Sequence, residues 1–219
     1  MTTSSLDDLD LVIRTMSSTI VDNADYFAQL DSIVGDGDFG YSLRSGWEVV
    51  LADYDGWDRP NAGAVLKKIG LTLAGKVGGV SGPMWGTAFL RAGATAGEQE
   101  LTPDLVIEML RAAIAGIMAR GGASLGDKTL LDALAPATDS LEASFKDPAT
   151  FEDHGVAAIQ RAADVAVKAA EDTKGMLALR GRAAYTGDRS RDSVDAGATA
   201  IGVILQAVAA AWRDQHGKQ

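Results

Sequence analysis

Apolar residues recur at helical spacing along most of the chain. In the first segment, Leu6, Leu9, Ile13, Met16 and Ile20 are separated by three or four positions, which places them on one face of a helix. Alanine is frequent and runs of β-branched residues are scarce, so we predict no strand. Helices are expected at about residues 5–21, 24–34, 40–52, 61–76, 84–96, 103–120, 128–145, 152–174 and 196–213.

Residues with known preferences for helix ends mark several of these boundaries. Pro103 is expected at the first position of its helix, where a missing N–H group is harmless. Pro136 should kink the helix that contains it. The side chains predicted to cap helix N-termini are Asn23, Thr102, Asp127 and Asp195.

The connections between the predicted helices are mostly short, and short connections make successive helices antiparallel neighbours. We therefore predict an all-α fold, an antiparallel up-down barrel or bundle of eight helices. The length of 219 residues fits one domain, residues 1–219. Alternate connections of such a fold lie at the same end, which would bring together residues 31–42, 78–83, 121–128 and 175–195.

Composition narrows the class of protein. The chain has no cysteine, which excludes disulfides and thiolate metal sites. Its net charge of −10 argues against nucleic acid and anionic membranes as partners, because both are polyanions. The N-terminal residues are polar and acidic, unlike a secretion signal, and the apolar run at 201–212 is too short to span a bilayer. We expect a cytoplasmic protein, with His154 and His216 on its surface.

Three acids stand close together in the stretch LDSIVGDGDFGYS, and we call Asp31, Asp36 and Asp38 the acidic cluster. Carboxylates repel one another, so such a cluster is unfavourable unless a cation lies among them. An oxygen-only set of ligands suits Mg²⁺, which binds a few carboxylates together with waters and substrate phosphates. An ordinary Asp- and Gly-rich turn is the alternative interpretation.

The stretch GGVSGP, residues 78–83, forms a second unusual segment, the glycine loop. Unhindered amides before a helix can bind a phosphate, and Ser81 can add a hydroxyl donor; a tight connection between helices is the alternative. Gly70, Gly75 and Lys76 match the start of a P-loop, but Val77 stands where Ser or Thr would bind Mg²⁺. The acidic stretch DYDGWDRP lacks the glutamate that closes an EF-hand loop, so it is interpreted as a turn.

Basic residues gather at residues 175–195, which we call the arginine segment. It contains Arg180, Arg182, Arg189 and Arg191 in an otherwise acidic protein. Arginines on a mobile segment could bind phosphates or close over a nucleotide as a lid. A solvated loop with local ion pairs is the alternative.

These stretches together resemble a known family, the L subunit of bacterial dihydroxyacetone kinase, which is also the C-terminal domain of single-chain forms. The resemblance covers nearly the whole chain. It is carried by LDSIVGDGDFG, GGVSGPMWGTAFLRA, RGGASLGDKTLLDALAPA, and GRAAYTGDRS followed by DAGAT, four motifs in order.

The resemblance implies an eight-helix barrel that binds ADP or ATP with Mg²⁺ at one end. It implies that the acidic cluster, Asp31, Asp36 and Asp38, holds Mg²⁺, and that Arg182 is the catalytic arginine of the lid. The residues that it places around the nucleotide are Phe39, Gly40, Tyr41, Ser42, Gly79, Val80, Ser81, Gly121, Leu130, Arg182, Asp195, Ala196 and Gly197.

The sequence departs from the family at three points. Phe39 stands where relatives often carry histidine, and Ser42 where asparagine is common. The stretch before the last helix, often His-Gln-Asp-Pro-Gly, reads SVDAG at residues 193–197. These differences concern the contacts to the nucleotide and the identity of the substrate.

The resemblance also implies partners, because no part of this chain looks like a ketose site. In the family the ketose is bound through a histidine of a separate K subunit. The phosphoryl donor is either ATP or a bound ADP that an M subunit of the phosphotransferase system rephosphorylates. A homodimer is a further possibility that the sequence leaves open. Two other interpretations remain: an ADP-sensing adaptor read by a transcriptional regulator, and an acidic helical scaffold that binds no Mg²⁺–ADP.

Overall fold

The computed structural model describes residues 5–147 and 155–217, and within these ranges it contains helices but no strand. This confirms the all-α prediction. The helices are α1 (Ser5–Asp22), α2 (Ala24–Ser32), α3 (Phe39–Asp53), α4 (Ala62–Lys76), α5 (Ser81–Ala96), α6 (Pro103–Gly121), α7 (Leu131–Phe145), α8 (Val156–Asp172) and α9 (Ala196–His216). Two segments of 3-10 helix are η1 (Tyr54–Gly56) and η3 (Arg182–Asp192).

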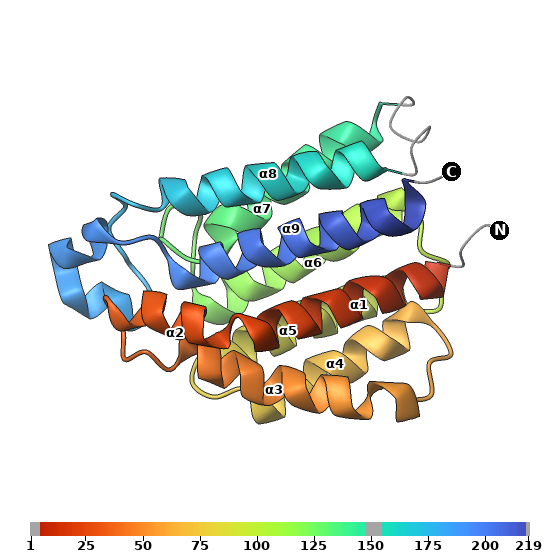
Figure 1. The fold of residues 1–219 in the computed structure, drawn as a ribbon, viewed down its shortest axis with the longest axis horizontal. Helices are drawn as coiled ribbons and strands as arrows, with labels where there is room; N and C mark the ends of the chain where they lie inside the picture. The colour runs from red at the N-terminus through yellow and green to blue at the C-terminus, as the bar shows by residue number, and fades with distance from the viewer. Residues whose placement is uncertain (1–4, 148–154, 218–219) are drawn as a thin grey trace.

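The α-helices form a closed ring of antiparallel legs (Figure 1). Helices α1 and α2 run in the same direction and are separated by Asn23 alone, so together they make one leg. Each later helix contacts the helix before it, and α9 contacts α1, which closes the ring. The described residues therefore contain nine α-helices, as many as the predicted ranges, and these make the eight legs of the predicted barrel because α1 and α2 share one leg.

Large apolar side chains fill the interior of the ring. Trp47 of α3 is fully buried and meets Trp85 and Phe89 of α5 edge to face, with ring centroids 6.4 and 5.5 Å apart. Burying one such side chain stabilises the fold by about 2 kcal/mol. Helix α9 is the one described helix long and apolar enough to cross a membrane, yet 44% of its apolar window is buried in the protein. A helix in the core of a protein can be equally long and apolar.

The helix caps agree with the prediction at two of four positions. The Thr102 hydroxyl accepts a hydrogen bond from Leu105 N at 3.2 Å, and the Asp195 carboxylate accepts one from Ala198 N at 2.7 Å. Asn23 was predicted wrongly, because its Nδ2 donates backwards to Thr19 O at 2.8 Å and leaves the start of α2 without a side-chain cap.

The predicted cap at Asp127 is also wrong. Helix α7 begins at Leu131, because Gly126 and Lys128 both take positive φ angles, 89° and 63°, and turn the chain first. Helix α5 begins earlier than predicted, at Ser81 rather than Met84. The predicted start of the eighth helix, at residues 152–154, lies outside the described residues.

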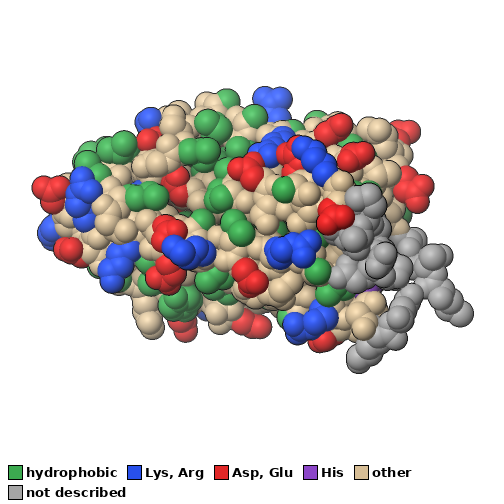
Figure 2. Space-filling view, turned by 90° about the horizontal axis from the view of Figure 1, so that it is seen from above, with side chains coloured by type: hydrophobic (Ala, Val, Ile, Leu, Met, Phe, Trp, Pro, Cys, Tyr) green, Lys and Arg blue, Asp and Glu red, His purple; other side chains and the backbone are tan. Residues whose placement is uncertain are grey.

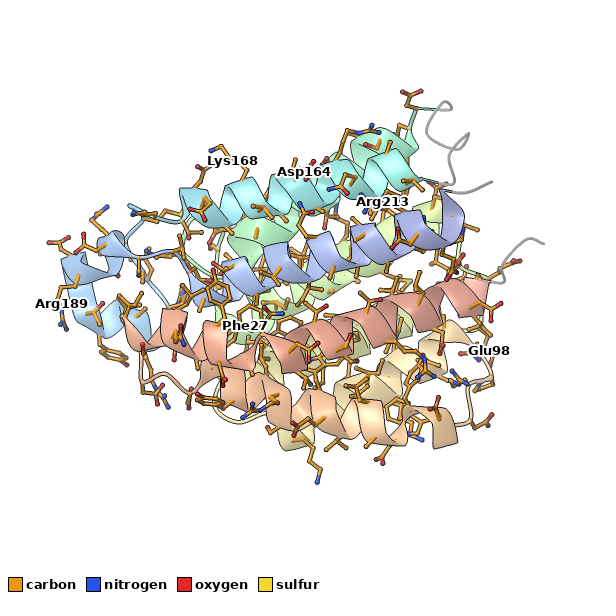
Figure 3. The ribbon with its side chains drawn as sticks, in the orientation of Figure 1. Phe27, Glu98, Asp164, Lys168, Arg189 and Arg213 are labelled. Carbon is orange, nitrogen blue, oxygen red and sulfur yellow. The ribbon has the colours of Figure 1, made fainter. Side chains whose placement is uncertain are left out.

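Alternate connections gather at one end of the ring, on the left of Figure 1, as the predicted topology requires. They join α2 to α3, α4 to α5, α6 to α7, and α8 to α9. Figure 3 places Arg189 at this end and Glu98 at the opposite end. We call the end that carries Arg189 the loop end of the protein.

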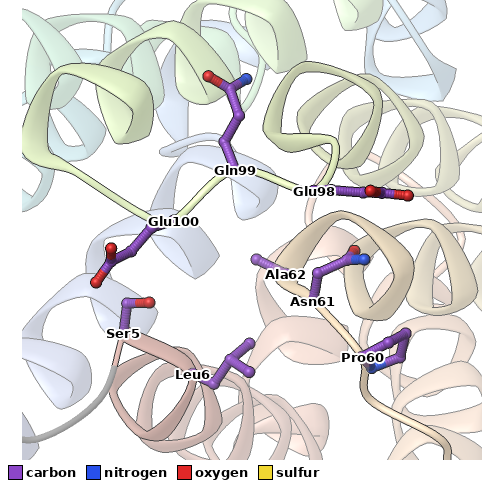
Figure 4. Close-up of a pocket in the computed structure, with 8 residues that line it drawn as sticks. All are labelled: Ser5, Leu6, Pro60, Asn61, Ala62, Glu98, Gln99 and Glu100. Carbon is purple, nitrogen blue, oxygen red and sulfur yellow. The ribbon is translucent and has the colours of Figure 1, made fainter.

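A groove of about 250 Å³ lies at the opposite end, beside the start of α1 (Figure 4). It is lined by Ser5, Leu6, Pro60, Asn61, Ala62, Glu98, Gln99 and Glu100. Close by, His216 at the end of α9 is only 6% exposed, with its Nε2 3.1 Å from Asp8 Oδ1, so the prediction of a surface histidine is wrong. His154 lies outside the described residues.

Candidate functional site

The acidic cluster lies at the loop end, where the chain turns from α2 into α3. Asp31 is near the end of α2, Asp36 lies in the turn, and Asp38 immediately precedes α3. One carboxylate oxygen of each residue lies within 4.8 Å of those of the other two. The structure thus brings together the three side chains that the sequence singled out.

Glycine shapes the turn that carries the cluster. Gly37 has a φ of 73°, a conformation that residues with a side chain rarely adopt, and its N–H donates to Asp31 Oδ2 at 2.9 Å. A methyl group at Gly40 would overlap Ala24 O and lie 2.7 Å from Ala28 N. The first turn of α3 therefore packs directly on α2, and this contact fixes where Asp38 stands relative to Asp31.

Arg182 of η3 supplies positive charge to the cluster. Its Nη1 forms an ion pair with Asp36 and lies 3.3 Å from Asp38 Oδ2. These side chains are 56%, 46% and 51% exposed for Arg182, Asp36 and Asp38, so water screens the pairs and each contributes only about 0–1 kcal/mol. A cation that competes for these carboxylates therefore meets little resistance from the arginine.

The chemistry of the cluster fits a hard divalent cation. All of its donor atoms are carboxylate oxygens, and two of the three side chains are about half exposed. Mg²⁺ takes few protein carboxylates and keeps waters or substrate oxygens in its remaining positions. The open side of the cluster leaves room for such ligands.

The glycine loop lies beside the first turn of α3. A Cβ at Gly78 would stand 3.2 Å from the Ser42 hydroxyl, so residues 39–42 and the loop are neighbours. Gly79 has a φ of 61°, and Val80, which precedes α5, offers no side-chain cap to the helix. The first N–H groups of α5, starting at Ser81, are therefore available to an anion.

Three further residues predicted to border the nucleotide, Gly121, Leu130 and Gly197, each lie close to a neighbouring segment. A Cβ at Gly121 would lie 3.1 Å from the sulfur of Met84 in α5. A Cβ at Gly197 would lie 3.2 Å from Leu130 Cβ, so the starts of α7 and α9 touch. Burial raises the pKa of the Asp195 carboxyl to about 7, against the hydrogen bond that it accepts from Ala198.

The arginine segment is more firmly attached than the sequence suggested. The Asp127 carboxylate accepts hydrogen bonds from Arg180 Nε at 2.8 Å and from Ser124 N at 2.9 Å. These bonds keep the pKa of Asp127 below its usual range. Arg191 donates to Gly175 O at 2.7 Å. In Figure 2 basic and acidic side chains alternate over the loop end instead of forming one basic patch.

Sequence reasoning missed the residue beneath this segment, Lys128. Its ammonium group donates to three backbone carbonyls of the arginine segment. The only signal in the sequence was its place in the motif GDKT, directly after the glycine-containing stretch at residues 121–126. That motif entered the resemblance, but no role was assigned to the lysine.

A family model described as the DAK2 domain matches residues 33–210 of the chain. The ADP-binding subunit DhaL of the PEP-dependent dihydroxyacetone kinase of Escherichia coli is 35% identical over 192 residues, which cover 87% of this chain and 90% of the relative. The L-erythrulose 1-kinase of Mycolicibacterium smegmatis is 34% identical and matches 90% of this chain, but this chain covers only 34% of that longer protein.

Among solved structures, the dihydroxyacetone kinase of C. freundii in complex with AMP-PNP and Mg²⁺ has a similar fold. The TM-score is 0.71 at 27% sequence identity, and the match covers 91% of this chain and 33% of the crystallised chain. The same kinase in its native form gives a TM-score of 0.73 at 25% identity. This chain is thus similar to about one third of a larger enzyme.

Proposed function

The chain belongs to the DAK2 domain family, and from that premise we propose that it is the nucleotide-binding, phosphoryl-transferring subunit of a small-ketose kinase. The proposed protein is a single cytoplasmic domain that binds Mg²⁺ with ADP or ATP at its loop end. The names of its relatives, an ADP-binding kinase subunit and an erythrulose kinase, support the reaction class.

One observation carries this proposal. Three carboxylates that approach within 4.8 Å lie at the same end of the ring as a free helix N-terminus and an arginine. Each feature alone is common in proteins. Together they supply the groups that a nucleotide phosphate chain requires: metal ligands, amide donors and a positive charge.

The proposed roles follow from the position of each residue. Mg²⁺ on the acidic cluster would neutralise negative charge on the phosphates of the nucleotide. The amides at Gly79, Val80 and Ser81, with the Ser81 hydroxyl, would bind the terminal phosphate at the start of α5. Residues 39–42, next to the glycine loop, would approach the phosphates from the side of α3.

Arg182 would act as the catalytic arginine. Its guanidinium already reaches the acidic cluster, so a small movement would bring it onto the phosphoryl group. There it would stabilise the charge of the transition state and exclude water. In the transfer, a ketose hydroxyl oxygen forms the new O–P bond, the bond from phosphorus to the leaving phosphate oxygen breaks, and the hydroxyl proton is released.

The remaining predicted residues would border the nucleoside. Gly121 and Leu130 are proposed at the adenine, and Asp195, Ala196 and Gly197 at the start of α9 beside it. The contact between Leu130 and Gly197 supports one continuous surface formed by these two groups. Phe39 would present an aromatic ring where relatives often present histidine.

A separate subunit would supply the ketose, as the resemblance implies. We propose a K subunit as acceptor partner, and an M subunit of the phosphotransferase system as donor if ADP stays bound. The dependence of the Escherichia coli enzyme on PEP, stated in its name, supports the second donor.

The test is reconstitution of the purified chain with a K subunit, Mg²⁺ and dihydroxyacetone. Ketose phosphate formed with ATP alone identifies ATP as donor, whereas formation only with an M subunit identifies bound ADP as carrier. Absence of both activities, together with no change in melting temperature on adding Mg²⁺–ADP, would contradict the proposal.

A further inference from the structure

Lys128 occupies an unusual position between α6 and α7. It is 3% exposed, although lysine is rarely buried, and its φ is 63°. Among the described residues it is the one non-glycine with a positive φ. Such a conformation is unfavourable for a residue with a side chain, so surrounding contacts must hold it.

Those contacts are made by its ammonium group. Nζ lies 2.6 Å from Ser193 O and 3.3 Å from Met176 O, and it also donates to Ser190 O. An ammonium group has three N–H donors, so all are used. Burial lowers the pKa of Lys128. The hydrogen bonds to three carbonyls oppose this effect by stabilising the charged form.

The three carbonyls belong to the two ends of the arginine segment. Met176 lies just after α8, whereas Ser190 and Ser193 lie just before α9. One side chain therefore joins the start and the end of a segment whose middle, η3, carries Arg182. Ser190 is the only buried residue of η3, so the rest of η3 has little packing to hold it.

The backbone next to Lys128 strengthens the same attachment. Asp127 O accepts a hydrogen bond from Leu179 N at 3.0 Å, and the Asp127 carboxylate holds Arg180. Asp132 holds the chain between α6 and α7 in place, because its carboxylate accepts hydrogen bonds from Thr129 N at 2.7 Å and from Gly126 N at 2.5 Å. The turn before α7 is thus a rigid base for the arginine segment.

We propose that Lys128 is a positioning residue that ties both ends of the arginine segment to this base and so sets where Arg182 stands over the acidic cluster. The segment is then fixed at its two ends, and only the part of η3 before Ser190, which includes Arg182, is free to shift. The attachment of the arginine segment by Lys128 does not depend on the proposed function. Its consequence for phosphoryl transfer rests on that function.

The first test is limited proteolysis of the full-length chain with the variant Lys128→Met, which keeps the aliphatic stem and removes the donors. Trypsin can cut after Arg182, Arg189 and Arg191, and mass spectrometry identifies the sites. We expect cleavage there to become about tenfold faster, because buried carbonyls lose charge-assisted hydrogen bonds. The matched control is Lys168→Met, which removes an exposed lysine on α8 and should leave these rates unchanged.

The second test separates positioning of Arg182 from a merely structural role. In the reconstituted kinase, Lys128→Met should lower kcat about tenfold or more while changing the KM for the ketose less than twofold, since the ketose is held on the partner. In the background of Arg182→Ala, the same substitution should have little further effect on kcat. An equal loss in both backgrounds would overturn the positioning role.

If Lys128→Met fails to fold, a second variant, Lys128→Arg, still tests the proposal. Lys128→Arg keeps the charge and two or more donors, so it should fold and restore slow cleavage in part. Wild-type cleavage rates in a folded Lys128→Met protein would overturn the proposal, and so would cleavage of a folded Lys128→Arg protein as fast as that expected for Lys128→Met. If the wild-type protein transfers no phosphoryl group, the proposed function fails, and the proteolysis still decides the attachment.

Discussion

The Arg182 guanidinium reaches the acidic cluster across the loop end of the ring, where it pairs with Asp36 and lies 3.3 Å from Asp38 Oδ2. The two partners come from η3 and from the turn between α2 and α3, which are far apart in the sequence. A basic side chain thus occupies carboxylates that we propose as Mg²⁺ ligands. Arginine and metal should therefore compete for them.

This competition predicts opposite effects of Arg182→Ala on two measurements. Binding of Mg²⁺ without nucleotide should become up to about fivefold tighter, because removal of an exposed ion pair frees the carboxylates at a cost of at most about 1 kcal/mol. Phosphoryl transfer should fall by about 10²- to 10³-fold, because the transition state loses a charged donor. Calorimetry and the coupled kinase assay measure these quantities.

Arg189→Ala is the matched control, since Arg189 lies on the same 3-10 segment with an exposed side chain at the far edge of the loop end (Figure 3). It should change neither quantity by more than about twofold. Weaker Mg²⁺ binding by Arg182→Ala would show that the arginine supports the metal ligands instead of competing with the ion.

The acidic cluster itself predicts a second result. Asp36→Asn should abolish the rise in melting temperature that Mg²⁺–ADP produces in the wild-type protein. Ligand at 100 times its dissociation constant stabilises a folded protein by about 2.7 kcal/mol, so the effect is easily measured by thermal denaturation. Without ligand the variant should be as stable as the wild type, because one of three repelling carboxylates is gone and only a screened ion pair is lost.

The control for this variant is Asp58→Asn, which removes an exposed acid at the other end of the ring. Its response to Mg²⁺–ADP should equal that of the wild-type protein. A normal ligand response in Asp36→Asn would mean that the carboxylates form an ordinary polar turn, the alternative that the sequence left open.

Much of this arrangement could be predicted because it depends on local chemistry. The helices follow from apolar spacing, and the alternation of loop ends follows from short connections between antiparallel legs. Asp31, Asp36 and Asp38 are close in sequence, so a glycine-rich turn was enough to predict that they converge. The caps at Thr102 and Asp195 are local as well.

The features that could not be predicted from the sequence depend on contacts between segments that are distant along the chain. Lys128 is identified by three carbonyls about fifty or more positions away, and no spacing rule points to them. His216 is buried because α9 closes the ring against α1, which brings it to Asp8. Asn23 lost its predicted role because α1 continues into the turn and offers Thr19 O as a nearer acceptor.

The contact of α3 with α2 predicts a third result. Gly40→Ala should strongly destabilise the protein, since the new methyl group would overlap Ala24 O and crowd Ala28 N at 2.7 Å. Both are backbone atoms that cannot rotate away, so the two helices must separate. We expect a loss of about 3 kcal/mol or more in the free energy of unfolding, measured by denaturant titration.

Gly56→Ala provides the comparison, because nothing lies within 4 Å of a Cβ at Gly56 and its φ is not positive. That variant should unfold within about 0.5 kcal/mol of the wild-type protein. If Gly40→Ala were equally well tolerated, the close packing that fixes Asp38 relative to Asp31 would be disproved.

The half-buried capping residue of α9, Asp195, predicts a dependence of stability on pH. The pKa of Asp195 is raised by burial from an ordinary value of 3.8 to about 7. Between these values the folded protein binds a proton that the unfolded chain releases, so Asp195 favours folding below about pH 4 and loses this contribution as pH rises to 7. Groups with lowered pKa, such as Asp127 and Glu142, act in the opposite direction and at lower pH.

Asp195→Asn isolates this effect, because asparagine still caps the helix but does not titrate. The free energy of unfolding of the wild-type protein, minus that of the variant, should fall by about 1 to 3 kcal/mol between pH 4 and pH 7, as urea titrations at each pH would measure. All other titratable groups are common to both proteins and cancel in the difference. A difference that stays constant over this range would mean that the Asp195 carboxylate is as well solvated in the folded protein as in the unfolded chain.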